Sequence, residues 1–189
     1  MDDVLLWSQL KAGNHQALKQ IYDTNIRNLD NYAQKFTSDN AMIEDTIHDL
    51  FVQIWNKREN LGNTDSIIKY LCVSLRRELI RRIGKAQDII SFEGSENTNF
   101  TLSVEDMIIS DETTDQNKKK LDNAMQNLSG RQKEAIYLRY YEEMEYEEIC
   151  EIMTINYQSV RNLISKAIIE LRQYMTMMIF FVTFLLLII

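Results

Sequence analysis

The sequence of 189 residues contains no proline and only five glycines. β-Sandwiches and barrels need many tight turns, and Rossmann or P-loop nucleotide sites need clustered glycines, so the composition disfavours these folds. The two cysteines, Cys72 and Cys150, lie far apart in apolar patterns, which argues against a disulfide framework or a zinc site. No secretory signal is recognisable, so we expect a reducing, cytoplasmic setting. Long helices with few interruptions remain, and we predict an all-α fold.

Patterns that carry catalysis or bind metals are also missing. The two histidines, His15 and His48, stand alone, without a carboxylate and a nucleophile at a readable spacing. The chain has no glycine-rich phosphate loop, and no Cys or His spacing suits a metal. We therefore expect no catalytic residues, no metal and no cofactor, and we predict that the protein is not an enzyme.

The net charge of −7 is carried by a single segment of the chain. Residues 1–90 contain twelve basic and twelve acidic side chains, and residues 118–189 contain nine of each. Residues 91–117 contain seven acids and no Lys or Arg. Because a phosphate surface responds to local charge, this acidic balance does not exclude nucleic-acid binding by the flanking regions.

Apolar periodicity divides the chain into two helical blocks. Residues 1–85 and 118–174 carry apolar stripes at helical spacing, and we predict one helical domain in each. Residues 86–117 have the polar, acidic composition of a flexible linker. The uncharged, apolar tail of residues 175–189 would span about 22 Å as a helix, less than the ~30 Å core of a bilayer. We expect a partner protein or a membrane surface to cover this tail.

The end of the second block has the dimensions of a helix-turn-helix. The pattern predicts a short helix over 146–153, a turn at Thr154-Ile155-Asn156, and a longer helix with Val160 and Ile164 on its inner face. Thr154 stands where glycine is usual, so we expect a turn without easy access to positive φ. The outer face carries side chains that donate to phosphate and can read base edges, namely Gln158, Ser159, Arg161, Asn162, Ser165 and Lys166. The alternative is the solvated face of an ordinary helical hairpin.

A second basic feature lies at the end of the first block. Between Ile67 and Lys85, one acid, Glu78, accompanies six basic residues: Lys69, Arg76, Arg77, Arg81, Arg82 and Lys85. Arg77, Arg81 and Lys85 follow one another at four-residue steps and share a helix face. Such a charge excess is typical of a surface that binds a phosphate backbone. The alternative is again a solvated face.

Three stretches together resemble a known family. Glu44-Asp45-Thr46-Ile47-His48-Asp49-Leu50-Phe51-Val52-Gln53-Ile54-Trp55 is similar to a motif written AEDxxQexFxxxW. The basic helix from Tyr70 to Arg82 is the second stretch. The third is Leu128-Ser129-Gly130-Arg131-Gln132 followed by Tyr146-Glu147-Glu148-Ile149 and Ser159-Val160-Arg161-Asn162, which resembles LPxRQ…YeEIA…SxgTVks. Over residues 4–174 the chain resembles the extracytoplasmic function (ECF) group of bacterial RNA polymerase sigma factors.

The resemblance implies roles for these residues. The helix with Asp45, Asp49, Gln53 and Trp55 would bind the clamp of core RNA polymerase. Residues implied in −10 promoter recognition are Asn60, Asn63, Thr64, Lys69, Arg76, Arg77, Arg81 and Arg82. The helix-turn-helix would read the −35 element of promoter DNA. An anti-sigma factor, soluble or membrane-bound, is the further partner that the resemblance implies, and the apolar tail is a candidate contact for it.

Two other functions compete with this interpretation. The first is a stand-alone helix-turn-helix regulator that binds DNA without joining the polymerase. Such a protein has no need of the helix from Glu44 to Trp55, so binding to core polymerase separates the two. The second is a membrane-tethered helical adaptor, which only the tail suggests and which both DNA-binding features oppose.

Overall fold

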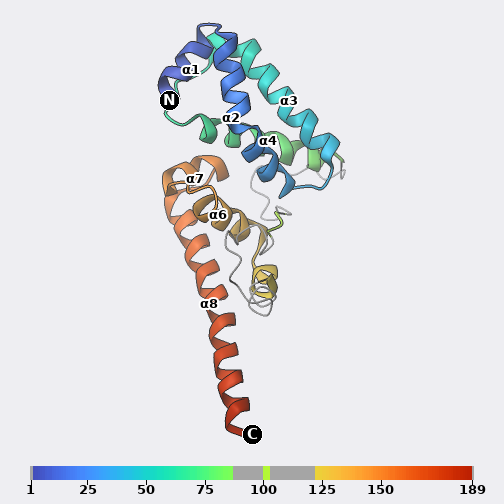
Figure 1. The fold of residues 1–189 in the computed structure, drawn as a ribbon, viewed down its shortest axis with the longest axis vertical. Coiled ribbons are helices and arrows are strands. Elements are labelled where there is room, and N and C mark those ends of the chain that lie inside the picture. Colours follow the sequence, from blue (N-terminus) through green and yellow to red (C-terminus); the bar gives the residue numbers. More distant parts are fainter. Residues whose placement is uncertain (1, 87–99, 103–121, 189) are drawn as a thin grey trace. The chain divides into compact units, whose positions relative to one another are not determined.

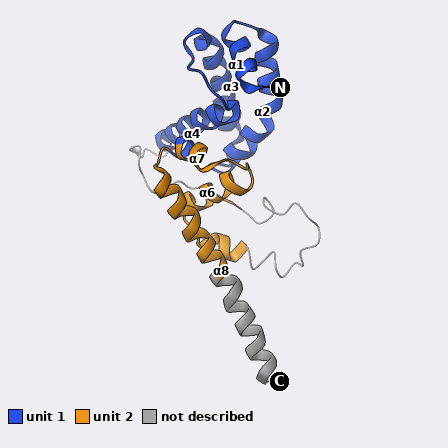
Figure 2. Cartoon of the chain, turned by 90° about the vertical axis from the view of Figure 1, so that its left-hand side faces the viewer, with its two compact units in different colours: residues 1–95, 151–153 blue, residues 96–150, 154–189 orange. Residues whose placement is uncertain are grey.

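The computed structural model describes residues 2–86, 100–102 and 122–188, with side chains as far as residue 172. Within these ranges the chain is helical and contains no strand, which confirms the all-α fold. The chain divides into two compact units, residues 1–95 with 151–153 and residues 96–150 with 154–189 (Figure 2).

The first unit is a bundle of helices. Its elements are α1 (Asp3–Lys11), α2 (His15–Gln34), α3 (Asn40–Lys57), the 3-10 turn η1 (Arg58–Asn60) and α4 (Ile67–Ala86) (Figure 1). Helices α2, α3 and α4 each pack against the other two, and α1 packs against α2 and η1. Apolar side chains at helical spacing fill the space between them, including the fully buried Leu29, Ile43, Leu71, Leu75 and Leu79.

Polar side chains fix the starts of these helices. The carboxylate of Asp39 accepts a hydrogen bond from Met42 N at 3.0 Å, and the Asn14 side chain accepts one from Gln16 N at 2.9 Å. These bonds satisfy amide groups that have no partner inside the helix. Helix α1 ends at Lys11, and the φ of 85° at Gly13, two residues further on, allows Asn14 N to donate back to Gln9 O at 3.0 Å.

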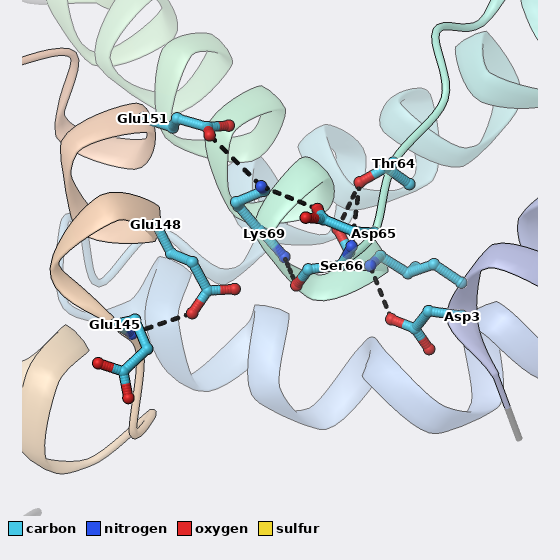
Figure 3. Close-up of polar contacts among 9 residues, drawn as sticks. Asp3, Thr64, Asp65, Ser66, Lys69, Glu145, Glu148 and Glu151 are labelled. Carbon is cyan, nitrogen blue, oxygen red and sulfur yellow. Dashed lines mark hydrogen bonds and ion pairs between the residues drawn. The ribbon is translucent and has the colours of Figure 1, made fainter.

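Helix α1 holds the loop that leads into α4. Trp7 is 2% exposed, and its Nε1 donates to Gly62 O at 2.9 Å. Asp3 accepts from Ile67 N at 2.8 Å and so caps a helix 64 residues further along the chain (Figure 3). The sequence offers Asp65 or Ser66 as a cap for this helix, and Ser66 Oγ accepts more weakly from Lys69 N, at 3.4 Å. Helix α1 therefore holds this loop at two points, at Gly62 and at Ile67.

The second unit is built around α6 (Gly130–Tyr140), the first five residues of α7 (Tyr146–Met153) and α8 (Tyr157–Ile188), with a further helical turn at residues 122–127. Helix α6 packs against α8. Ser129 and Gln132 form a reciprocal capping box at the start of α6. The core includes Tyr137, Ile149, Val160 and Ile164, none more than 1% exposed.

Several sequence expectations need correction. Tyr22 and Tyr141 stand at apolar positions of their helical stripes, so periodicity predicts that they point inward, but they are 41% and 39% exposed. Phe100 and Leu102 fall within the predicted linker yet are buried, and the Phe100 ring lies 5.7 Å from that of Tyr137. Phe100 is buried because Tyr137 of α6 offers a partner that local composition does not reveal. The rest of the predicted linker lies outside the described residues.

The predicted tail does not begin as a separate element. Helix α8 continues without a break from Tyr157 to Ile188 and so includes the backbone of nearly the whole tail. The side chains of this part lie outside the described residues, so what covers the tail stays a prediction. Among the helices searched within the described residues, none combines the length and the apolar character that crossing a bilayer requires.

Candidate nucleic-acid interface

The basic residues of α4 do not share one environment. Arg77, Arg81 and Lys85 are all exposed, as their four-residue spacing predicts. No ion pair joins Arg77 or Lys85 to another described residue. Arg76 and Arg82 are half-buried and lie off this row. The exposed row is the part of α4 that a phosphate backbone can reach directly.

Arg81 and Arg82 are engaged with carboxylates inside the first unit. Glu78 accepts from Arg81 Nε at 2.8 Å and from Arg82 Nε at 2.7 Å. Arg82 also donates through Nη2 to Asp49 Oδ2 of α3 at 2.5 Å. The hydrogen bond from Arg81, with a further one from Arg82, lowers the pKa of Glu78 to about 2. Glu78 is therefore a carboxylate at neutral pH, and it partly neutralises Arg81 and Arg82.

Lys69 and the loop before it form a separate cluster near the start of α4 (Figure 3). The Lys69 side chain is only 13% exposed, and its Nζ lies 3.0 Å from Asp65 Oδ1. The Thr64 hydroxyl donates to Ser66 O at 2.8 Å and accepts from Ser66 N, so it shapes the loop. Asn60 and Asn63 are exposed, and Asn63 Oδ1 accepts from Lys11 Nζ at 2.9 Å. The loop thus presents its two asparagines, while Thr64 and Lys69 are occupied internally.

The residues predicted to bind polymerase lie along α3. Asp45, Asp49 and Gln53 are spaced by four residues and share a face, on which Asp45 and Gln53 are exposed. Trp55 instead packs within the unit: its ring lies 4.1 Å from that of His15, and the guanidinium of Arg58 lies 4.6 Å from its centroid. Trp55 therefore fixes the end of α3 and is only half-exposed.

Helices α7 and α8 have the geometry of a helix-turn-helix. Their bounds, Tyr146–Met153 and Tyr157 onward, agree with the sequence pattern, and Asn156 Oδ1 caps α8 by accepting from Ser159 N at 2.8 Å. The turn differs from expectation, because Thr154 does adopt a positive φ of 55°. Ile155 N donates to Cys150 O at 3.0 Å, which closes the turn in the way that Gly13 closes α1.

The outer face of α8 presents most of the predicted side chains to solvent. Gln158, Arg161, Asn162, Ser165 and Lys166 are exposed, and Ser159 is half-buried. Gln158 Nε2 donates to Asn162 Oδ1 at 2.9 Å, so these two amides orient each other. Tyr157, which is absent from the residues predicted to bind DNA, is 48% exposed at the start of the same helix. Its place in the sequence beside Gln158, at the start of the helix predicted to contact DNA, is the signal that could have identified it.

The chemistry of these surfaces is that of binding. Across the described residues no group of three or more His, Cys, Asp or Glu side chains is placed to hold a metal. The surfaces offer guanidinium, ammonium and amide donors, which suit phosphate oxygens and base edges.

Comparisons with known proteins agree with this organisation. Residues 21–89 match the family model described as Sigma-70 region 2, and residues 118–171 match that described as Sigma-70, region 4. No curated protein matches the sequence significantly. The region 2 match falls in the first unit, and the region 4 match falls in the second unit except for residues 151–153.

Two solved structures share the fold. One is CnrH in complex with the cytosolic domain of CnrY, at a TM-score of 0.61 and 16% identity, covering 92% of this chain and 97% of that one. The other is the sigma factor RpoE in complex with the anti-sigma factor NepR from Bartonella quintana, at a TM-score of 0.56 and 20% identity, covering 84% and 96%. At such identities the likeness concerns the fold.

Proposed function

The chain belongs to the sigma-70 family of bacterial RNA polymerase sigma factors, in the ECF group, and from this premise we propose how its residues divide the work of initiation. Members of this family bind core RNA polymerase and promote transcription initiation at promoters, and this protein is such a factor. The family acts without catalysis of its own. We assign it to the cytoplasm, where core polymerase and promoter DNA are found.

The observation that carries the proposal is the pairing of region 2 and region 4 matches, in that order, with exposed donor surfaces in both units. In the first unit, Arg77, Arg81 and Lys85 of α4 contact the backbone near the −10 element, and Asn60 and Asn63 contact an unpaired base. In the second unit, the outer face of α8 reads the −35 duplex. The protein lends these surfaces to the polymerase and stabilises opened DNA.

Helix α3 is proposed to face the polymerase. Its exposed Asp45 and Gln53, with the partly exposed Asp49, offer acceptors to a basic surface on the partner. A stand-alone regulator has no use for this row. Capture of purified core polymerase by the wild-type protein, and weaker capture by Asp45→Lys, are expected. Failure of the wild-type protein to bind the polymerase would refute the proposed function.

Transcription in vitro with purified core polymerase tests the DNA contacts. Arg77→Ala removes an exposed cation without a described ion pair, so promoter opening should fall several-fold while the helical signal in circular dichroism stays unchanged. Arg27→Ala removes an exposed cation from α2 and serves as the matched control, with little effect expected. Equal opening by both variants would contradict the role of α4.

The −35 assignment is tested on a randomised promoter library. Arg161 and Asn162 are exposed near the start of α8, where a recognition helix meets base edges. Arg161→Ala and Asn162→Ala are therefore expected to change the preferred −35 sequence. An unchanged preference in both variants would remove α8 from base readout.

An anti-sigma factor is the remaining proposed partner. Both solved neighbours are recorded with a second protein, the cytosolic domain of CnrY and the anti-sigma factor NepR. We propose that the apolar tail of residues 175–189 is covered by such a partner. Deletion of residues 176–189 should weaken binding of the cognate anti-sigma factor, and unchanged binding would reject this part of the proposal.

A further inference from the structure

A compact ion network connects the helix proposed to bind polymerase with the helix proposed to bind DNA. Glu78 holds both Arg81 and Arg82, and Arg82 reaches across to Asp49 of α3. The side chains of Glu78 and Arg82 are each 23% exposed, whereas those of Asp49 and Arg81 are 48% and 49% exposed. Two carboxylates thus face two guanidinium groups, and the network opens to solvent at both ends.

The contacts of these carboxylates are those that a DNA phosphate would make. Arginine binds carboxylate and phosphate through the same N–H groups, in the same planar geometry. Arg81 and Arg82 each donate a hydrogen bond from Nε to Glu78, and Arg82 donates another from Nη2 to Asp49. A phosphate that binds either arginine through these atoms must therefore displace a carboxylate.

We propose that Glu78 and Asp49 are internal competitors of DNA phosphate, which hold Arg81 and Arg82 in the free protein and weaken its binding to DNA. The inference rests on the proposed role of α4 in DNA binding. Glu78 lies on α4 itself and restrains both arginines, whereas Asp49 restrains Arg82 alone. Because Asp49 belongs to α3, a basic group of the polymerase that takes this carboxylate frees Arg82 Nη2 and leaves Arg82 held by Glu78 alone. Binding to the polymerase and readiness to bind DNA are then coupled through one side chain.

The ordinary alternative is that these ion pairs only support the helices. Pairs at i,i+3 and i,i+4 on exposed helices contribute little to stability and need no ligand to explain them. This alternative predicts a small loss of stability when Glu78 is neutralised and no specific change in DNA affinity. Competition predicts a gain in affinity that depends on salt.

Binding of the purified full-length protein to a fluorescent 20-nucleotide single strand of mixed sequence, at several salt concentrations, separates the two. Each phosphate contact to a single strand contributes about 0.7 to the slope of log K against log salt. Glu78→Gln frees Arg81 and leaves Arg82 held by Asp49 alone, so it should steepen the slope by at least about 0.7. Asp49→Asn leaves Arg82 held by Glu78 alone, so it should steepen the slope by a smaller amount. At low salt we expect Glu78→Gln to raise affinity roughly 10-fold.

Glu44→Gln is the matched control, because it removes the same charge from an exposed position on α3. It should change affinity less than two-fold and leave the slope unaltered. An equal gain in the control, or an unchanged slope in both test variants, overturns the inference. If Glu78→Gln does not fold, Asp49→Asn at its more exposed site decides the question. The proposed function is judged separately, by whether the wild-type protein binds core polymerase.

Discussion

Thr154 ends α7 in a backbone conformation that glycine fills most easily, so we expect Thr154→Gly to stabilise the second unit. A left-handed conformation costs a residue with a side chain about 1–2 kcal/mol, and branching at Cβ adds to the crowding. The Thr154 side chain is exposed, so little contact is lost on its removal. Glycine gives back about 0.5–1 kcal/mol through the greater freedom of the unfolded chain. The net gain should be about 0.5–1 kcal/mol.

The molecule contains its own precedent for this substitution. Gly13, at φ 85°, closes α1 with the same backbone hydrogen bond, from Asn14 N to Gln9 O, that Ile155 N makes to Cys150 O at the end of α7. Glycine therefore fits this turn without any change of geometry. Promoter selection by the variant should remain that of the wild type.

Thermal unfolding, followed by tryptophan fluorescence and by circular dichroism, separates the effect of Thr154→Gly on the second unit from any change in the first. Both tryptophans, Trp7 and Trp55, lie in the first unit, whereas circular dichroism reports on helices of both. For a small domain the expected gain raises the transition by about 2–8 °C. The transition seen by dichroism should shift and that seen by fluorescence should not. Thr24→Gly, at an exposed site within α2, is the control and should lower the fluorescence transition. A lower or unchanged dichroism transition for Thr154→Gly would refute the reasoning.

Three further substitutions test other contacts. Burial raises the pKa of Glu142, so the folded protein favours the protonated carboxyl, and stability falls as the pH rises through the folded pKa. Glu142→Gln should therefore raise the melting temperature at pH 7, with a smaller gain near pH 4. Ser129→Ala removes the bond from Gln132 N and should cost about 1 kcal/mol in urea unfolding of the second unit, whereas a cost near zero would contradict the capping box. Trp7→Phe removes the 2.9 Å hydrogen bond to Gly62 O and should lower the free energy of unfolding by about 1–2 kcal/mol, measured by chemical unfolding followed by dichroism. It should also weaken −10-dependent promoter opening. Full opening activity would show that the loop keeps its conformation without this bond to α1.

Local rules predicted the second unit well. Tyr146–Met153, the following turn and the inward Val160 and Ile164 agree with the structure, because apolar periodicity and capping residues act over a few positions. The φ of Thr154 escaped prediction, because the closing hydrogen bond of the turn outweighed its steric preference.

Contacts between distant residues were not predictable in this way. The sequence indicated a basic α4, but a run of arginines with one acid is compatible with free or paired side chains. Only the packing of α3 on α4 brings Asp49 to Arg82, 33 residues away. Phe100 was missed for a similar reason, since its neighbours are polar and its partner, Tyr137, lies far along the chain. The assignment of individual residues to promoter elements stays a prediction.

The attachment of α1 to the loop before α4 has a consequence for synthesis of the protein. Trp7 and Asp3 find their partners 55 and 64 residues downstream, at Gly62 and Ile67. On the ribosome, α1 emerges well before these partners and must wait, with a large aromatic ring unburied, while the intervening helices are translated. During that interval, chaperones and proteases can reach this part of the nascent chain most easily. The interval ends when Ile67 has left the exit tunnel.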